Sequence, residues 1–382
     1  MFSVIFYAQL KRHLKLSSYW AALPFLFNSR TGMVTMMSSR WAILLHKVEL
    51  ASTLIYTILQ CVMTLTSSYP ETNKYIAMVF ISVYGTGLGL RFSWKMDPVP
   101  MEFMNSLMQY ERKLLDGIQY KKTLPDKIMT FILPLVLFTG TLLPFACVLV
   151  LAKFPCAPPF LGSMLTYCRD VAAEGDYQIP VFARVGILIA EFFMFCHVCI
   201  AAAFYITHVL FPGLICVWDY IRIVDSWEIY TISEISKCIQ AYRELRIIEI
   251  LNNLTNRTRV LPACAIGFPA IQFFSFYVCI RLHENIPPAA FIMFPTAYFD
   301  CFLFTIVIFT AAARVYTGSE SLLKKWERRF PNVQRKSVMR KTFISFPPLK
   351  VRMGGNFVEA FTPLVVQDFC VRTTASMLML SQ

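Results

Sequence analysis

The chain has 382 residues, of which 57% are apolar and only 15% are charged. Soluble domains usually contain about 45–50% apolar and about 25% charged residues, so this composition excludes an ordinary soluble protein and indicates a protein that crosses a membrane several times. The formal net charge is +13. Because the Lys and Arg residues stand beside long apolar runs, they indicate the lipid bilayer as the partner and argue against nucleic acid.

Seven stretches meet the requirement for a membrane helix, which is roughly 20 mostly apolar residues. We therefore predict an all-α polytopic membrane protein with seven transmembrane helices, at Trp41–Leu65, Lys74–Trp94, Ile128–Leu151, Val181–Trp218, Leu261–Ile280, Ala289–Ala313 and Phe357–Leu380. The fourth stretch is too long for one helix perpendicular to the bilayer. It is either strongly tilted or extends past the bilayer, and Pro212-Gly213 near its end permits a break.

The segments between these spans alternate in charge. Lys and Arg are frequent before the first span and in Met96–Asp126, Asp219–Arg259 and Arg314–Lys350. They are scarce in the segments that lie on the opposite side, which are Ser67–Thr72, Ala152–Pro180 and Leu282–Pro288. Lys and Arg beside membrane spans are biased to the cytoplasmic side. We therefore predict that the N-terminus lies inside the cell and the C-terminus outside.

This orientation divides the chain into six parts. They are a cytoplasmic N-terminal segment (1–40), helices one to four (41–218), a cytoplasmic amphipathic helix (219–260), helices five and six (261–313), a basic cytoplasmic segment (314–356), and helix seven with an extracellular end (357–382). Two glycosylation sequons, at Asn253 and Asn256, argue the other way because they fall on the predicted cytoplasmic side. Such triplets occur often by chance, so we expect these two to be unused.

The segment before the fifth span carries signals of a helix. Thr231-Ile-Ser-Glu234 has the pattern of a capping box, and apolar residues follow at helical spacing as far as Asn252-Asn253. This helix either continues the fourth span below the membrane and packs on other cytoplasmic helices, or lies along the bilayer surface. The simplest alternative is a plain surface helix between two spans.

Ionisable residues inside a membrane span are costly and are therefore candidates for function. Glu191 in the fourth span and Asp300 in the sixth are the clearest. They orient a polar ligand group, attract a cation, or form structural hydrogen bonds between helices. His46 and Glu49 are three residues apart and can pair on one helix face. Arg91, at the inner end of the second span, is expected to extend toward the membrane surface.

The cysteines and histidines do not indicate a metal site. Cys196-His197-Val198-Cys199 lies within a span, and the sequence has no second CxxC motif to complete a zinc site. Cys156 and Cys168 fall in the third loop, on the predicted outer side, where a disulfide is plausible but is not established by spacing. We find no phosphate-binding loop and no nucleophile elbow. The sequence therefore predicts neither an enzyme nor a bound cofactor.

The seventh span is the most polar of the set. Polar residues interrupt it at Thr362, Gln367, Asp368, Arg372, Thr373, Thr374 and Ser376. Asp368 and Arg372 are four residues apart, so they can neutralise one another on one helix face. A helix of this polarity should not face lipid. We expect it to face either the interior of the bundle or a water-filled pore formed by several subunits.

Two short stretches resemble one receptor family. The segment from Tyr242 to Asn252 is similar to a helix that precedes the fifth span in that family and tends to end in Leu/Ile-Asn. The last span of the family carries Thr-Tyr, five apolar residues and then Gln-Phe. Here Phe361 and Gln367 match, but Ala360 replaces Thr and Phe369 is displaced by one residue. Together with the predicted topology, these two stretches make the chain resemble a divergent member of the arthropod gustatory and odorant receptor superfamily.

The resemblance implies a chemosensory receptor in the plasma membrane that acts as a ligand-gated, non-selective cation channel for small molecules. It implies a homo- or hetero-tetramer of related subunits, a central pore lined by the seventh spans, and a ligand pocket in the outer half of each subunit. The residues at matching pocket positions are Tyr84, Phe138, Glu191, Phe192, Tyr298 and Asp300, and those of the pore are Val365, Asp368, Arg372 and Ser376. The alternatives are a non-channel seven-helix receptor and a membrane transporter.

Overall fold

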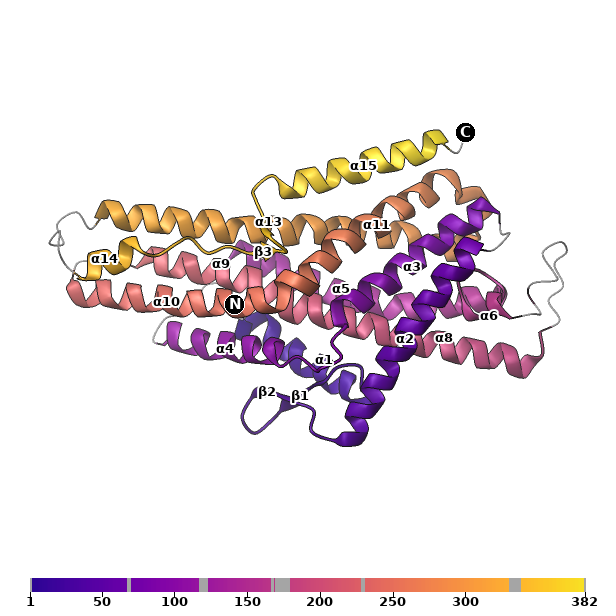
Figure 1. Cartoon of the computed structure of the whole chain (residues 1–382), viewed down its shortest axis with the longest axis horizontal. Coiled ribbons are helices and arrows are strands. Elements are labelled where there is room, and N and C mark those ends of the chain that lie inside the picture. The colour runs from indigo at the N-terminus through magenta and orange to yellow at the C-terminus, as the bar shows by residue number, and fades with distance from the viewer. Residues whose placement is uncertain are drawn as a thin grey trace.

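The computed structural model describes residues 2–66, 70–116, 123–165, 168, 179–227, 231–329 and 338–380. The helices are α1 (Tyr7–Trp20), α2 (Arg40–Thr66), α3 (Glu71–Arg91), α4 (Val99–Leu114), α5 (Leu124–Lys153), α6 (Leu161–Met164), α8 (Val181–Phe204), α9 (Phe211–Ser226), α10 (Ile232–Thr255), α11 (Leu261–Arg281), α12 (Pro288–Phe291), α13 (Met293–Arg329), α14 (Val338–Ile344) and α15 (Thr362–Leu380). Two antiparallel hairpins accompany them: β1 (Phe25–Asn28) with β2 (Met33–Met36), and β3 (Arg352–Met353) with β4 (Asn356–Phe357). The predicted all-α class is confirmed, and α8, α9, α10 and α13 run along the longest axis of the bundle (Figure 1).

Each predicted span coincides with a long helix. Within the described residues, five helical segments are long and apolar enough to cross a membrane by length and composition alone: Arg40–Thr66, Asp126–Lys153, Val181–Ser226, Ser233–Arg281 and Met293–Arg328. The second and seventh predicted spans correspond to α3 and α15, which have 21 and 19 residues. Helix α13 begins at Met293, slightly later than the predicted start of the sixth span at Ala289, and continues as a helix beyond Ala313 to Arg329.

The fourth span continues past the bilayer. Its helix runs from Val181 to Ser226 over 46 residues, which corresponds to about 69 Å, whereas the hydrocarbon core is about 30 Å thick. Pro212 does not break it, because a π-helical segment, Tyr205–Leu210, precedes the first turn of α9. A π-helical turn is wider than an α-helical turn, so the helix continues although Pro212 has no backbone N–H to donate.

The first forty residues fold onto the bundle, which the sequence did not predict. Four apolar residues recur at intervals of four and are buried: Phe2, Phe6, Leu10 and Leu14. The start of this helix is capped by the Glu111 carboxylate of α4, which accepts hydrogen bonds from the backbone N–H groups of Phe2 (2.7 Å) and Ser3 (2.9 Å). The Tyr220 hydroxyl also donates to Glu111, at 2.7 Å, so one carboxylate joins α4, α9 and the N-terminus.

The capping box at the start of α10 is confirmed. The Thr231 N–H donates to Oε2 of Glu234 at 2.7 Å, and the Glu234 N–H donates to Oγ1 of Thr231 at 3.3 Å. Tyr242, Leu245 and Ile248 are buried, and the helix packs against α4 and α9. Helix α10 is therefore part of the bundle, and the alternative of a plain surface helix is wrong.

The two sequons lie in positions where a glycan does not fit the fold. Nδ2 of Asn253 donates to the Lys350 carbonyl at 2.8 Å, and its Oδ1 accepts from the Arg352 N–H at 2.8 Å. Asn256 is fully buried, and its Nδ2 donates to Oδ1 of Asn252 at 2.5 Å. We expect no glycan at either asparagine. Glycosidase treatment of the membrane protein should leave its gel mobility unchanged, whereas a mobility shift lost on Asn253→Gln would contradict both this fold and the predicted orientation.

A fully buried ion pair joins α2, α3 and α8. Arg91 donates from Nη1 and Nη2 to the two oxygens of Glu49, each at 2.8 Å. The same carboxylate accepts from the Thr53 hydroxyl at 3.0 Å and lies 3.3 Å from Nδ1 of His197. Arg91 is only 2% exposed, so the prediction that it extends to the membrane surface is wrong. His46 lies instead with Nδ1 3.2 Å from the Ala21 carbonyl.

A buried carboxyl group stands where α9 meets the start of α5. Asp219 is almost inaccessible to solvent, and its oxygens accept from the hydroxyl of Thr123, the N-cap residue of α5, at 3.3 and 3.4 Å. Arg222 lies 3.4 Å away. Burial, reinforced by the negative charge of Asp126, raises the pKa of Asp219 to about 6. At neutral pH this carboxylate therefore destabilises the fold.

The variant Asp219→Asn is expected to stabilise the protein at neutral pH. Because the pKa of the folded state lies above the unfolded value of 3.8, stability falls as pH rises from about 4 to about 6, by up to about 3 kcal/mol. The melting temperature of the variant in detergent should exceed that of the unchanged protein at pH 7.5 and equal it near pH 4. The exposed Asp116→Asn serves as the control. An equal gain at both pH values would contradict this explanation.

Candidate functional site

A cavity of about 400 Å³ lies at the end of the bundle that holds α6, far from α14 (Figure 1). Helices α3, α5, α12 and α13 and the loop before α6 form its walls. The lining residues are Pro70, Asn73, Ile76, Phe80, Cys147, Val150, Phe154, Cys156, Ala157, Pro158, Phe160, Cys168, Ile286, Pro287, Ala290, Met293 and Phe294. This size and this apolar lining are typical of sites for small molecules.

Aromatic rings form one wall of the cavity. The Phe80 ring of α3 packs edge-on against Phe160, with ring centroids 4.7 Å apart, and against Phe294 at 6.2 Å. The side chain of Asn73 supplies a polar group in the same lining. The cavity therefore suits a largely apolar molecule with a polar substituent.

A disulfide holds the loop that forms the outer wall. Cys156 and Cys168 are bonded, with their Cα atoms 5.6 Å apart, and both line the cavity. The loop folds back tightly at Gly162, where an added Cβ atom would lie 1.8 Å from the Pro155 carbonyl oxygen. Only glycine fits there, because the chain at Gly162 packs directly against the Pro155 carbonyl.

Glu191 supports this wall and does not line the cavity. Its carboxylate accepts hydrogen bonds from the hydroxyl groups of Tyr56 and Tyr84 and, at 2.6 Å, from the N–H of Leu161 at the start of α6. The side chain is only 2% exposed. Of the roles considered for Glu191, the structure shows the structural hydrogen bonds.

The other predicted pocket residues also lie outside the cavity lining. Tyr84 is buried about one turn from Phe80, whereas Phe138 is 62% exposed on the outside of α5. Phe192 packs on Phe145, with centroids 5.0 Å apart. The remaining two are on α13, where Tyr298 stacks on Phe276 and Asp300 contacts Thr139.

The residues that do line the cavity gave no distinct signal in the sequence. Phe80, Phe160 and Phe294 stand in or beside apolar runs that contain many other phenylalanines, and 34 are present in the chain. The only marked signal was the pair Cys156 and Cys168. Its position between two spans could have indicated that the third loop covers a pocket.

Helix α15 lies along one edge of the bundle (Figure 1) and packs on α11 and α13. Its inward face holds the buried residues Pro363, Cys370 and Thr374. The four residues assigned to the pore are all exposed in the single chain: Val365, Asp368, Arg372 and Ser376. Nε of Arg372 lies 2.9 Å from the Asp368 carboxylate. We call these four residues the polar stripe of α15.

Two of the three residues that carry the sequence resemblance in the last span, Gln367 and Phe369, contact α11. Nε2 of Gln272 in α11 donates to Oε1 of Gln367 at 2.6 Å, and Tyr298 of α13 also contacts Gln272. The Phe369 ring lies edge-on to Phe273, 6.3 Å between centroids. Phe361 is largely exposed. The amide pair therefore fixes the depth of α15 against α11.

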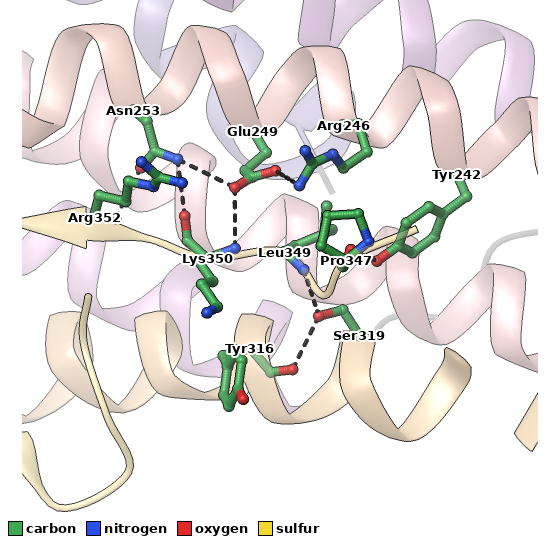
Figure 2. A network of polar contacts seen from close by, with 10 residues as sticks. All are labelled: Tyr242, Arg246, Glu249, Asn253, Tyr316, Ser319, Pro347, Leu349, Lys350 and Arg352. Atoms are coloured by element: carbon green, nitrogen blue, oxygen red, sulfur yellow. Dashed lines mark hydrogen bonds and ion pairs between the residues drawn. The ribbon is translucent and has the colours of Figure 1, made fainter. Parts of the chain in front are cut away.

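An extended segment connects the basic region to α15. We call this segment, Phe346–Met353, the linker strand. Figure 2 shows how it lies between α10 and α13. The Tyr242 hydroxyl donates to the Pro347 carbonyl at 2.9 Å, and the Leu349 N–H donates to the Ser319 hydroxyl at 2.9 Å (Figure 2). Leu349 is fully buried, so the strand is anchored at its middle.

Glu249 and Asn253 of α10 bind the next part of the linker strand. The Glu249 carboxylate accepts from the Lys350 N–H at 3.1 Å and pairs with Arg246 at 3.0 Å (Figure 2). Burial raises the pKa of Glu249. Side chains of α10 thus form the hydrogen bonds of the backbone groups of Lys350 and Arg352. The linker strand is therefore attached to α10 shortly before the chain enters α15.

No protein-family model matches the sequence, and no curated protein matches it. Solved structures with a similar fold include the insect olfactory receptor OR5 from Machilis hrabei in complex with eugenol, with a TM-score of 0.59, and the same receptor in a second structure, with a TM-score of 0.57. Each match has 11% sequence identity and covers 98% of this chain and 99% of the other chain. The chain therefore has, over nearly its whole length, the seven-helix membrane fold of an insect olfactory receptor.

Proposed function

We propose that this protein is a chemosensory receptor that acts as a ligand-gated, non-selective cation channel. The observation that carries the proposal is the polar stripe of α15. It places Asp368 and Arg372 on the outer edge of a membrane bundle, where charged side chains facing lipid are costly. A tetramer, homomeric or with related subunits, removes this cost by turning the four stripes toward a shared aqueous pore.

The outer cavity is the ligand site in this proposal. Its volume and its phenylalanine wall suit a small tastant or odorant, and the fold is shared with a receptor whose structure contains eugenol. Ligand binding between α3, α5 and α13 would act on α13, which packs against α15. In this proposal the protein lies in the plasma membrane, as the family resemblance implies, and the loop charges favour an N-terminus in the cytoplasm.

Filling the cavity is expected to weaken the response to ligand. Ala290 is buried and lines the cavity, so Ala290→Phe should occupy it and raise the half-maximal agonist concentration by at least about tenfold, or 1.4 kcal/mol. The measurement is calcium imaging of cells exposed to a panel of small apolar compounds that includes eugenol. The control is Ala8→Phe on the exposed face of α1. Equal responses of the two variants at equal surface expression would contradict the assignment of this cavity.

A further inference from the structure

A second hollow lies on the side of the bundle, separate from the outer cavity. It is a groove of about 860 Å³ between α3 and α11, with Leu54 of α2 at one edge. Figure 1 shows these helices inclined together at one side of the molecule. We call this hollow the α3–α11 groove.

Small residues on both helices create the groove. Gly85 and Gly89 are four residues apart on α3, and Ala263 and Gly267 are four apart on α11. The helices approach so closely that a Cβ atom on Gly267 would lie 1.9 Å from Oγ1 of Thr86. A Cβ atom on Gly85 would meet nothing within 4 Å. The groove therefore has free space over Gly85, and the contact between Gly267 and Thr86 closes its floor.

The lining offers apolar contact along most of its length. Leu88, Pro262 and Ile266 contribute apolar walls. Three hydroxyl side chains line the groove, those of Ser82, Thr86 and Thr258, of which Thr258 lies beside Arg259 at the charged end. On α3, Ser82 donates to the Met78 carbonyl at 2.7 Å and Thr86 donates to the Ser82 carbonyl at 2.6 Å. An occupant of this part needs no polar groups, as expected for a hydrocarbon chain.

One end of the groove is positively charged. Arg259 lines that end and lies 3.7 Å from the Asp97 carboxylate, which is longer than a hydrogen bond. Its guanidinium stands over the Tyr205 ring, 4.9 Å from the centroid. The neighbouring Arg257 donates to the neutral carbonyl of Gly354. The Arg259 guanidinium thus makes only a long ion pair with Asp97, and its Nε and Nη2 have no hydrogen-bond partner among the described residues, which favours an anionic partner.

The length of the groove matches one leaflet of a bilayer. On α3 it extends from Ser82 to Phe92, a distance of about 15 Å along a helix. The hydrocarbon core of a bilayer is about 30 Å thick, so one leaflet contributes about half of that. The charged end, at Arg259, would then stand at the level of the headgroups.

We propose that the α3–α11 groove binds an anionic phospholipid, with one acyl chain lying over Gly85 and the headgroup phosphate at Arg259. Anionic lipids are concentrated in the cytoplasmic leaflet, the side on which the loop charges place Arg259. The proposal rests on that orientation and does not depend on channel activity. It assigns a second ligand site, distinct from the outer cavity in position and in chemistry.

The test compares two glycine substitutions in the purified full-length protein. Gly85→Leu should fill the groove, and Gly186→Leu on α8 is a matched control, because that glycine is also exposed and an added Cβ there also meets nothing within 4 Å. Lipids retained in nanodiscs of equal phosphatidylserine and phosphatidylcholine are measured by native mass spectrometry. We expect retention of phosphatidylserine over phosphatidylcholine, lowered about tenfold by Gly85→Leu and unchanged by Gly186→Leu.

Arg259→Gln tests the headgroup contact. This variant should keep a bound phospholipid but lose the preference for phosphatidylserine. Equal retention of the two lipids by the unchanged protein, or equal behaviour of the two leucine variants, would overturn the proposal. A change of oligomeric state in Gly85→Leu alone would also overturn it, since the groove would then be a contact between subunits. Absence of ligand-evoked current would refute the proposed function but would not affect the conclusion about lipid binding in the α3–α11 groove.

Discussion

Replacing Asp368 by alanine is expected to reduce ligand-evoked cation current by at least about tenfold. In the proposed tetramer, four Arg372 side chains would then face the pore without their carboxylate partners, which lie 2.9 Å away in the intact chain. Two such charges about 8 Å apart repel by about 2 kcal/mol at an effective dielectric constant of about 20. A difference of about 1.4 kcal/mol in a barrier is a tenfold change in rate.

The opposite substitution provides the matched comparison. Arg372→Ala leaves four carboxylates and should raise the permeability of Na⁺ relative to Cl⁻, which is read from the reversal potential in whole-cell recording. The double variant, without either charge, should return the current toward that of the unchanged protein. If all three variants conduct as the unchanged protein does, the polar stripe does not line the pore.

Arg91→Met is expected to cause the largest loss of stability in the chain. It leaves the Glu49 carboxylate buried with only Thr53 and His197 as partners. Removing one member of a buried ion pair typically costs 3–5 kcal/mol, a large fraction of the stability of most proteins. Surface expression should fall severely, and the melting temperature of any purified protein should fall with it.

Two further variants separate lost charge pairing from general damage. Arg314→Met removes an exposed arginine from α13 and should leave expression unchanged. Glu49→Leu combined with Arg91→Leu removes both charges and should be better tolerated than Arg91→Met alone, because no unpaired charge stays buried. A double variant as unstable as Arg91→Met would show that the side-chain shape, and not the charge balance, stabilises this contact.

The helices were predictable from the sequence because apolar runs of sufficient length have few alternatives in a membrane. The capping box at Thr231 and Glu234 was equally clear, since both hydrogen bonds are local. Structure that depends on distant partners was not predictable. The N-terminal helix owes its start to Glu111, more than a hundred residues away, and the partner of Glu49 is Arg91 on another helix rather than His46 nearby.

The cavity that we propose as the ligand site was harder to predict from the sequence than the polar stripe. Polar residues in spans attract attention, yet Glu191 is occupied by Tyr56, Tyr84 and Leu161. The cavity itself is lined by residues such as Phe80 and Phe294, which look like any other apolar residues of a span. Whether such a side chain faces a cavity, a neighbouring helix or lipid depends on how the helices pack, and a single sequence does not encode this in a readable pattern.

The most direct test of the central claim asks whether the polar stripe of α15 faces other copies of the chain. Ser376→Cys should form disulfide-linked dimers under mild oxidation in native membranes, seen on a non-reducing gel. Ile189→Cys, on an exposed part of α8, and the unchanged protein serve as controls and should stay monomeric. Cross-linking of Ser376→Cys alone is the result that the tetrameric pore predicts. A Ser376→Cys protein that stays as monomeric as both controls would contradict it.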